Sequence, residues 1–330
     1  MSCVAPAMMR AVVLDGPGSA DALVVRRLPI PDPAPGWVLI RVRAFGLNRS
    51  ELHTRLGLAE GVTFPRVPGI EATGEVVACP GGEFAAGQRV MTMMGGMGRT
   101  FDGGYAEYTC VPAGQVTAFR SDLPWELLGA VPEMLQTAYG SLTTGLDAQP
   151  GQTLFVRGGT SSVGMAAAVL AKRQGLTVIS TTRSPAKADR LREIGVDHVL
   201  VDDGAVAPRL REILPAGADL ALELVGAPTL SDTLRTLKVH GVACFTGMLS
   251  NSWIVENFYP NAYLPSGVRL TSYSGGSADL PAEVLRDYLA AAELDRRLIP
   301  LDRVFALDQI AEAHEYMEQN RATGKLVVVP

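Results

Sequence analysis

Two hydrophobic patterns divide the chain. From Met9 to about Val131, short runs in which apolar and polar residues alternate are separated by clusters rich in Gly and Pro. Alternation with a period of two is typical of half-buried β-strands, so we expect strands at WVLIRVRA (37–44), GEVVA (74–78) and QRVMTM (88–93). This part of the chain is predicted to form a β-rich domain with irregular turns.

Between about Gln152 and Tyr273 the pattern changes to apolar runs separated by amphipathic segments of helical length. Strands that alternate with helices build a parallel, doubly wound sheet, so the predicted fold class is α/β. The runs are TLFV, TVIST, HVLV, DLALELV and GVACFTG, and the helical segments are 163–174, 186–194, 206–214 and 229–237. The tail adds predicted helices over 281–294 and 308–320 and a closing strand, KLVVV (325–329), that is expected to return to the first domain.

Composition narrows the choice of partners. At 330 residues the chain is long enough for about two domains. The net charge is -5 and Lys and Arg are scattered, which disfavours a nucleic acid or an anionic membrane. MSCVAPAMM lacks the pattern of a secretory signal, and no apolar run reaches the roughly 18 residues of a membrane span. We therefore expect a cytoplasmic protein that binds small molecules.

The four cysteines, Cys3, Cys79, Cys110 and Cys244, stand far apart without a CxxC pair. Paired spacing is typical of disulfide and zinc frameworks, so these residues are expected to be reduced thiols. A free cysteine usually behaves as a small buried hydrophobic residue. A structural role is therefore predicted for all four.

The stretch LFVRGGTSSVG (154–164) joins the first strand of the α/β region to its first helix. A turn reduced to Gly, Thr and Ser exposes backbone N–H groups, and a helix N-terminus attracts anions. Ser161 stands where the usual GxGxxG pattern commonly has a Gly, and a tight packing turn without a ligand is the alternative. We predict that a dinucleotide pyrophosphate binds here, at Gly158, Gly159, Thr160, Ser161, Ser162, Val163 and Gly164.

The end of the next strand indicates which dinucleotide binds. An NAD-binding unit places Asp or Glu there, on the ribose hydroxyls. This chain has Thr182, Arg183 and Lys187 instead, and its first acid after the turn is Asp189. Arg and Lys hold a 2′-phosphate through charge-assisted hydrogen bonds, whereas an acid would repel it. The sequence therefore favours NADPH over NADH, and solvated cations at a helix start are the alternative.

These features resemble the medium-chain dehydrogenase/reductase superfamily, over nearly the whole chain. The motifs NRSELHTRLG, FPRVPGIEATGEVV, GQRVMTM, GGYAEYTCVPA, LQTAYGSL and ATGKLVVV are similar to its quinone oxidoreductase-like branch. The resemblance implies a GroES-like catalytic domain over 1–131 and 275–330, a Rossmann domain over 132–274, and NADPH in a cleft between them. It also implies a homodimer, in which the strand VRLTSY (268–273) pairs with its twin and covers an exposed edge.

Departures from the metal-dependent relatives predict that no metal is bound. In zinc alcohol dehydrogenases a Cys stands at the position of Asn48, and the His of a GHE motif stands at the position of Ile70, before Glu71. Zinc sites require thiolate or imidazole ligands, which Asn and Ile do not provide. The lobe with four closely spaced cysteines is also missing between Met93 and Tyr105.

Without a metal, the resemblance implies an acceptor that tolerates charge after hydride arrives, such as a quinone or another activated enone or alkene. Asn48 is the first candidate for a hydrogen bond to the developing oxyanion, and a bond to local backbone is its alternative. His53 is a candidate proton donor or substrate contact, and the exposed face of a short helix over 50–56 is its alternative.

Further cofactor contacts are expected where strands of the α/β sheet end. Val225 and Gly226 follow one strand, and Thr246 and Gly247 follow the next. By resemblance Lys325 lies near the cofactor, with an edge-strand charge as the alternative. The aromatic and Pro-rich segment 251–267 is expected to cover the substrate, or else to form an interface or a core loop.

Two classes of function remain open. The first is an NADPH-dependent reductase of quinones or activated alkenes. The second is a catalytically weak NADPH sensor or interaction protein, because a fold does not determine a function. Oxidation of NADPH in the presence of an acceptor separates the two.

Overall fold

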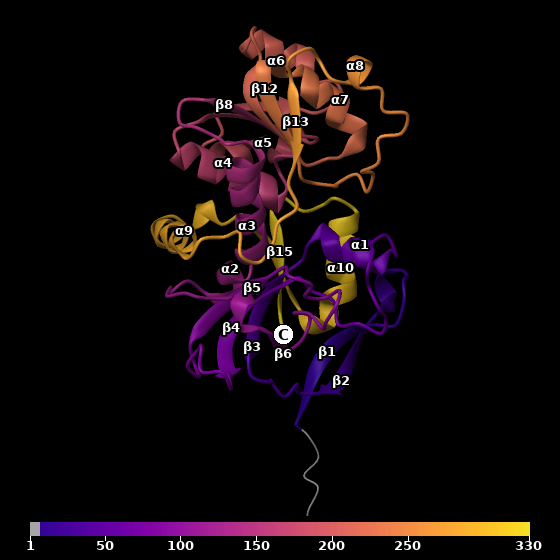
Figure 1. Cartoon of the computed structure of the whole chain (residues 1–330), viewed down its shortest axis with the longest axis vertical. Helices are drawn as coiled ribbons and strands as arrows, with labels where there is room; N and C mark the ends of the chain where they lie inside the picture. Colours follow the sequence, from indigo (N-terminus) through magenta and orange to yellow (C-terminus); the bar gives the residue numbers. More distant parts are fainter. Residues whose placement is uncertain (1–6) are drawn as a thin grey trace, which may run out of the picture. The chain divides into compact units, whose positions relative to one another are not determined.

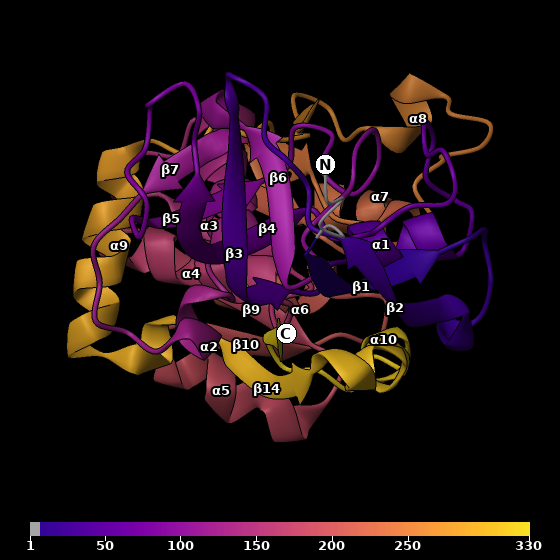
Figure 2. The same ribbon diagram turned by 90° about the horizontal axis from the view of Figure 1, so that it is seen from below.

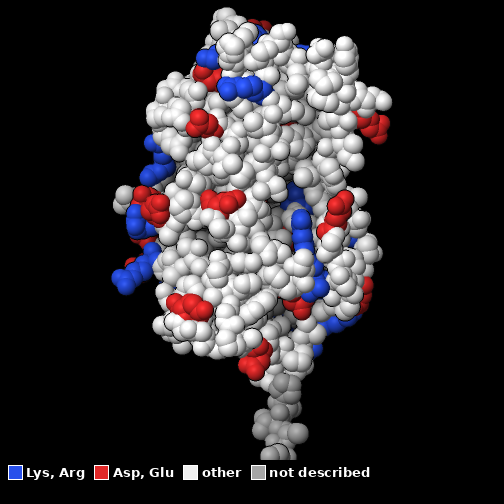
Figure 3. Space-filling view, in the orientation of Figure 1, with Lys and Arg blue, Asp and Glu red and all other residues white. Residues whose placement is uncertain are grey.

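A computed structural model describes residues 7–330, and the chain divides into two compact units. The first unit combines the residues up to Glu133 with Gly276–Pro330, and the second unit is Met134–Gly275 (Figure 1). In the described part of the chain, no helix has both the length and the apolar character needed to cross a membrane. Basic and acidic side chains are interspersed on the face drawn in Figure 3.

The first unit is rich in β-structure. Its main sheet has the order β14-β15-β3-β4-β5-β7, β6 pairs with β3, and β1 and β2 form an antiparallel hairpin (Figure 2). The tail strand β15 lies between β3 and β14. The elements are β1 (Met8–Leu14), η1 (Ala20–Ala22), β2 (Leu23–Pro29), β3 (Trp37–Gly46), α1 (Arg49–Arg55), β4 (Glu71–Ala78), β5 (Arg89–Met93), β6 (Tyr108–Pro112), η2 (Ala113–Gln115), β7 (Val116–Ala118), α2 (Trp125–Leu128), α9 (Ala282–Leu294), η5 (Arg296–Leu298), β14 (Leu301–Ala306), η6 (Leu307–Gln309), α10 (Ile310–Glu318) and β15 (Lys325–Val329).

The core of the first unit joins the sheet, the β1–β2 hairpin and α10. Strand β3 contributes Val38 and Ile40, whose side chains point to the same face because side-chain direction alternates along a strand. Helix α10 contributes Ile310, Ala313 and Met317, at the spacing of one helical face. Local periodicity therefore explains how both elements bury their apolar residues.

The second unit is a parallel sheet with the order β10-β9-β8-β11-β12-β13. In chain order this is 3-2-1-4-5-6, the doubly wound dinucleotide-binding topology, so the predicted α/β fold class is confirmed. Its elements are η3 (Ser141–Gly145), β8 (Thr153–Arg157), α4 (Ser162–Arg173), β9 (Thr177–Thr182), η4 (Pro185–Lys187), α5 (Ala188–Glu193), β10 (His198–Val201), α6 (Ala207–Ile213), β11 (Ala218–Glu223), α7 (Ala227–Arg235), β12 (Leu237–Phe245), α8 (Pro260–Tyr263) and β13 (Arg269–Ser272), and α3 (Pro132–Gly140) leads into it from the first unit.

Helices cover the sheet of the second unit as its alternating pattern requires. Helices α6 and α7 pack against Phe155, Ile179 and Ala221 of the strands. The helix predicted over 229–237 ends earlier, at Arg235, because Leu237 already pairs with the neighbouring strand. The glycine turn of 158–161 lies between β8 and α4, at the carboxyl end of the first strand.

Candidate functional site

Five polar side chains are buried together in the first unit, in a group that we call the carboxylate cluster. They are Asn48, Glu51, Glu71, Glu133 and Lys325. Asn48 and Glu51 belong to the N-cap and first turn of α1, Glu71 begins β4, Glu133 lies in the first turn of α3, and Lys325 begins β15. Buried polar groups are costly unless they are hydrogen-bonded, so the bonds inside the cluster determine whether it is stable.

The ammonium group of Lys325 lies at the centre of the cluster. Its Nζ is 2.7 Å from Glu71 Oε1 and 3.2 Å from Glu133 Oε2, and it donates a hydrogen bond to Asn48 Oδ1. Burial lowers the pKa of Lys325, but the charges of Glu71 and Glu133 outweigh this effect and raise the pKa above its ordinary value. The side chain of Lys325 has no exposed surface, so the structure places it inside this cluster.

The Asn48 amide is held by three side chains. Its Oδ1 accepts from Lys325, its Nδ2 donates to Glu71 Oε1 at 2.9 Å, and its Nδ2 is 3.4 Å from Glu51 Oε1. One amide hydrogen is therefore firmly bound and the other only weakly. Asn48 is the N-cap residue of α1 and forms a capping box with Glu51, and its amide also bonds side chains from outside this turn, so its bonds are not purely local.

Glu51 gives the cluster a group that titrates near neutral pH. Its Oε2 accepts the backbone N–H of Asn48 at 2.9 Å and its Oε1 accepts that of Ile70 at 2.8 Å. Burial raises the pKa of Glu51 to about 7, and the charge of Glu71 adds to the rise, whereas the Ile70 hydrogen bond opposes it. Gly46 makes room for the cluster, because a methyl group there would overlap Lys325 and Glu71.

The two histidines near this cluster are buried. His53 lies in α1 with 8% of its surface exposed, so the alternative of an exposed helix face is wrong. His314 in α10 has its Nε2 3.1 Å from the Tyr105 hydroxyl, and burial lowers its pKa to about 3. His314 is therefore neutral at physiological pH.

In the second unit, the glycine turn packs so closely that it requires small residues. Gly158 has φ +84°, a conformation that strains other residues. A methyl group at Gly159 would overlap the Ser180 side chain, and one at Gly164 would lie 2.7 Å from the Gly158 carbonyl oxygen. Packing alone thus explains part of the motif.

Ser161 explains why the turn forms without the usual glycine. It is the N-cap of α4, and its Oγ accepts from the Gly164 N–H at 3.1 Å and donates to the Gly158 carbonyl at 2.8 Å. Within residues 7–330, the N–H groups of Ser162 and Val163 have no hydrogen-bond acceptor. Unpaired N–H groups at the first turn of a helix fit an anionic ligand such as a pyrophosphate.

The four predicted contacts at strand ends are organised by Glu223, which sequence reasoning missed. The N–H groups of Val225 and Gly226 donate to its Oε1 at 2.7 and 3.0 Å, and those of Thr246 and Gly247 donate to its carbonyl oxygen. These four backbone N–H groups are therefore already hydrogen-bonded within the protein. A ligand here would meet carbonyl oxygens and side chains.

The predicted phosphate-reading residues lie just past β9. Thr182 is buried, and its hydroxyl bonds the backbone of Ser184 at 3.0 and 3.2 Å, so it shapes the turn. Arg183 is exposed and Lys187 is half-buried. A cation at the start of α5 opposes the helix dipole, which disfavours a purely structural role for Lys187.

Arg157 was also missed, although a charge that ends an apolar strand is a visible signal. It directly precedes the glycine turn, is fully buried, and lies 2.8 Å from Asp202 and 2.7 Å from Asp232. These ion pairs tie the end of β8 to the loop after β10 and to α7. The ion pairs of Arg157 therefore fix the start of the glycine turn.

The segment 251–267 exposes several apolar side chains. Ile254 is 72% exposed and Tyr259 is 63% exposed. Strand β13, which follows, is at the edge of its sheet within the described chain. The predicted homodimer would cover this edge, and it stays a prediction.

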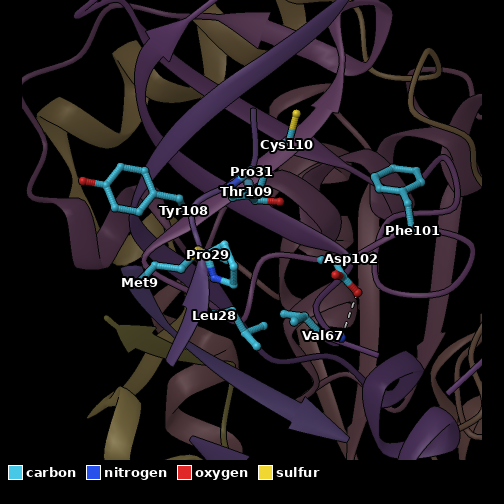
Figure 4. A pocket seen from close by; sticks show the side chains of 11 residues that line it. Met9, Leu28, Pro29, Pro31, Val67, Phe101, Asp102, Tyr108, Thr109 and Cys110 are labelled. Carbon is cyan, nitrogen blue, oxygen red and sulfur yellow. Dashed lines mark hydrogen bonds between the residues drawn. The ribbon is translucent and has the colours of Figure 1, made fainter. Parts of the chain in front are cut away.

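The first unit also contains a hollow of about 400 Å³, shown in Figure 4. Its lining includes Met9, Val67, Phe101 and Cys110, and none of the residues predicted for the site. Burial raises the pKa of Cys110 to about 11, so this thiol stays protonated at neutral pH. Cys79, Cys110 and Cys244 are free thiols, and Cys3 lies outside the described residues.

The residues at the expected zinc position do not fit a zinc ion. Asn48 offers a carbonyl oxygen that already accepts from Lys325, and Ile70 offers no ligand atom. No set of three or more His, Cys, Asp or Glu side chains in residues 7–330 is arranged to hold a metal.

Two family models match the chain. A model described as alcohol dehydrogenase GroES-like domain matches residues 34–121, and one described as zinc-binding dehydrogenase matches residues 194–328. The first match lies in the first unit, and the second extends over parts of both units.

Several known proteins are similar to the chain over almost its whole length. Prostaglandin reductase-3 of Bos taurus is 29% identical, over 98% of this chain and 90% of its own. The probable quinone oxidoreductase of Schizosaccharomyces pombe is 28% identical, over 94% of both, and the human synaptic vesicle membrane protein VAT-1 homolog is 26% identical, over 98% and 87%. A mycobacterial protein solved in complex with NADPH is 26% identical, with a TM-score of 0.83, over 98% of this chain and 100% of its own.

Proposed function

The chain belongs to the medium-chain dehydrogenase/reductase superfamily, in its zinc-independent quinone oxidoreductase-like branch, and from this premise we propose that it is an NADPH-dependent reductase of quinones or other activated enones or alkenes. Similar proteins include a prostaglandin reductase, a quinone oxidoreductase and a 2-haloacrylate reductase, which supports an oxidoreductase. The choice of NADPH and of the acceptor class is our proposal. Cytoplasmic location and a homodimer stay predictions.

The observation that carries the proposal is the first turn of α4. The unpaired N–H groups of Ser162 and Val163 are suited to bind a pyrophosphate, and Gly158 and Gly159 allow the tight turn that precedes them. NADPH, when bound, supplies the hydride. Arg183 and Lys187 are proposed to bind its 2′-phosphate, because both cations follow the strand at which an NAD-binding unit carries an acid.

In the first unit, Asn48 is proposed to donate one amide hydrogen to the acceptor oxygen. Hydride transfer to a quinone or an enone leaves negative charge on that oxygen, and a preorganised donor stabilises it. One Asn48 amide hydrogen faces Glu51, and because the distance from Nδ2 to Glu51 Oε1 is 3.4 Å, this hydrogen is weakly bound. It is therefore the one proposed to bond the acceptor oxygen. His53 is proposed as a proton donor or substrate contact.

Cofactor choice is tested by titrating the protein with NADPH and NADH and following tryptophan fluorescence. Hydrogen bonds to charged groups contribute about 1.5–3 kcal/mol each, so NADPH is expected to bind at least tenfold more tightly. The double variant Arg183→Ala/Lys187→Ala should lose this preference and keep its affinity for NADH. The matched control is Arg192→Ala, an exposed arginine of α5 whose loss should change neither affinity. Tighter binding of NADH would refute the cofactor assignment.

Catalysis is tested by NADPH oxidation with a panel of 1,4-benzoquinone and small enones. A reductase should oxidise NADPH much faster with at least one acceptor than without any. Binding of NADPH without turnover of any acceptor would favour the sensor or interaction protein. Failure to bind either nucleotide would reduce the glycine turn to a packing feature.

A further inference from the structure

The orientation of the Asn48 amide is decided by its charged neighbours. An amide group has nearly the same shape in its two flipped orientations, and only its hydrogen-bond partners distinguish them. The Lys325 ammonium has only donors, and every partner of the Glu71 carboxylate is a donor, namely Lys325, Asn48 Nδ2 and the Glu133 N–H. The flipped amide would place its oxygen against Glu71 and its N–H groups against the ammonium. Only the observed orientation satisfies both neighbours.

We propose that Lys325, held by Glu71 and Glu133, is a positioning residue that fixes the Asn48 amide for catalysis. This rests on the proposed function of Asn48. Lys325 donates to the Asn48 Oδ1, and Glu71 accepts one hydrogen of the Asn48 Nδ2. These two bonds fix the plane of the amide and therefore the direction of its second hydrogen. The positive charge beside Oδ1 also polarises the amide and strengthens its remaining N–H as a donor.

We call the arrangement in which Lys325, held by Glu71 and Glu133, fixes the Asn48 amide the Lys325 clamp. The clamp is itself rigid. The backbone N–H of Lys325 donates to the Pro300 carbonyl at 2.6 Å, and its ammonium lies between Glu71 and Glu133. Gly46 packs so closely against Lys325 and Glu71 that even a methyl group has no space. A lysine enclosed in this way is suited to hold Asn48, and direct contact with a dinucleotide is not needed to explain it.

The test is a double-mutant cycle with Lys325→Met and Asn48→Ala, read out as kcat with a fixed acceptor. Methionine keeps the apolar length of the side chain and removes the charge. Lys325→Met should lower kcat at least tenfold, with NADPH affinity within twofold of wild type because the residues proposed to bind the NADPH phosphates lie in the other unit. In the Asn48→Ala background, the same change should have no further effect on kcat.

Three results would overturn the proposal. These are a Lys325→Met variant with kcat within twofold of wild type, additive losses in the two backgrounds, or a loss of NADPH affinity at unchanged kcat. A loss of NADPH affinity at unchanged kcat would indicate that Lys325 contacts the cofactor directly. If Lys325→Met does not fold, Glu133→Gln serves in its place, with a smaller loss of kcat expected that also vanishes in the Asn48→Ala background.

The proposed function and the clamp fail in different ways. If the wild type turns over no acceptor, the proposed function fails. The clamp is then tested by NMR, which measures the exchange rates of the side-chain amide protons of Asn48. Slow exchange of one of these protons, accelerated at least tenfold in Lys325→Met or Glu133→Gln, is expected for a clamped amide. Equal exchange in wild type and variant would refute the clamp.

Discussion

The two candidate sites are built from different materials. In the second unit, the backbone of one continuous turn supplies the donors, and its glycines leave no space for additional atoms. In the first unit, side chains supply the site, and Lys325 reaches Asn48 across 277 positions of sequence. A backbone site should therefore be most sensitive to added atoms, and the carboxylate cluster to a lost charge.

Glu71→Ala is expected to have the largest effect on stability. It leaves the buried Lys325 ammonium with one carboxylate fewer, and breaking a buried ion pair costs about 3–5 kcal/mol. The control is Glu75→Ala on the same strand, whose pair with Arg43 is partly exposed and contributes at most about 1 kcal/mol. Urea unfolding measures the free energy of unfolding of both variants. Equal losses would contradict the claim that the buried ion pairs of the carboxylate cluster contribute more than a partly exposed pair.

The pH dependence of stability tests the same cluster through the protonation of Glu51. Because the pKa of Glu51 is raised from 4.5 to about 7, the folded protein holds a proton that the unfolded chain releases between these values. Stability from this group is thus present below about pH 4.5 and is lost as the pH rises through 7. The complete shift corresponds to roughly 3 kcal/mol.

The measurement compares wild type with Glu51→Gln in urea at pH 5 and pH 8. The wild type should lose more stability than the variant between these values. His314 acts in the opposite direction, because its pKa is lowered to about 3 and its contribution is lost as the pH falls below 6.5. This effect cancels in the difference between the two proteins. Parallel pH profiles would exclude a titrating Glu51.

Gly159→Ala tests whether the turn is sensitive to added atoms. The new methyl group would overlap Ser180, and overpacking of this kind costs about 1–3 kcal/mol. NADPH affinity should fall at least tenfold as well. Gly114→Ala, which adds a methyl group in open space, should change neither property. A destabilised variant with full NADPH affinity would mean that the turn serves packing alone.

Changes at Ser161 should have the smallest effect. Its hydroxyl caps α4, so Ser161→Ala should cost about 1 kcal/mol, whereas Ser161→Gly should cost only a few tenths. NADPH affinity should stay close to that of the wild type in both, because the hydroxyl is used inside the turn. Calorimetric unfolding and the fluorescence titration check this, and a large loss of affinity would show that Ser161 contacts the cofactor directly.

The local features of this protein were predictable from its sequence. The period of the apolar pattern predicted the parallel sheet, and the strand KLVVV was placed at its observed bounds, Lys325–Val329. The glycine turn was predicted because its glycines and its capping serine stand in one short stretch. Such features depend on interactions between near neighbours, which any single sequence displays.

Tertiary structure alone decided the surroundings of each side chain. His53 is buried, Lys325 holds Asn48, Glu51 accepts from the distant Ile70 N–H, and Arg157 pairs with Asp202 and Asp232 of later segments. Burial and charge pairing depend on which distant segments the fold brings together. A glutamate three residues after Asn48 is typical of a helix cap, and only burial in the folded protein, together with the charge of Glu71, raises the pKa of Glu51 to about 7.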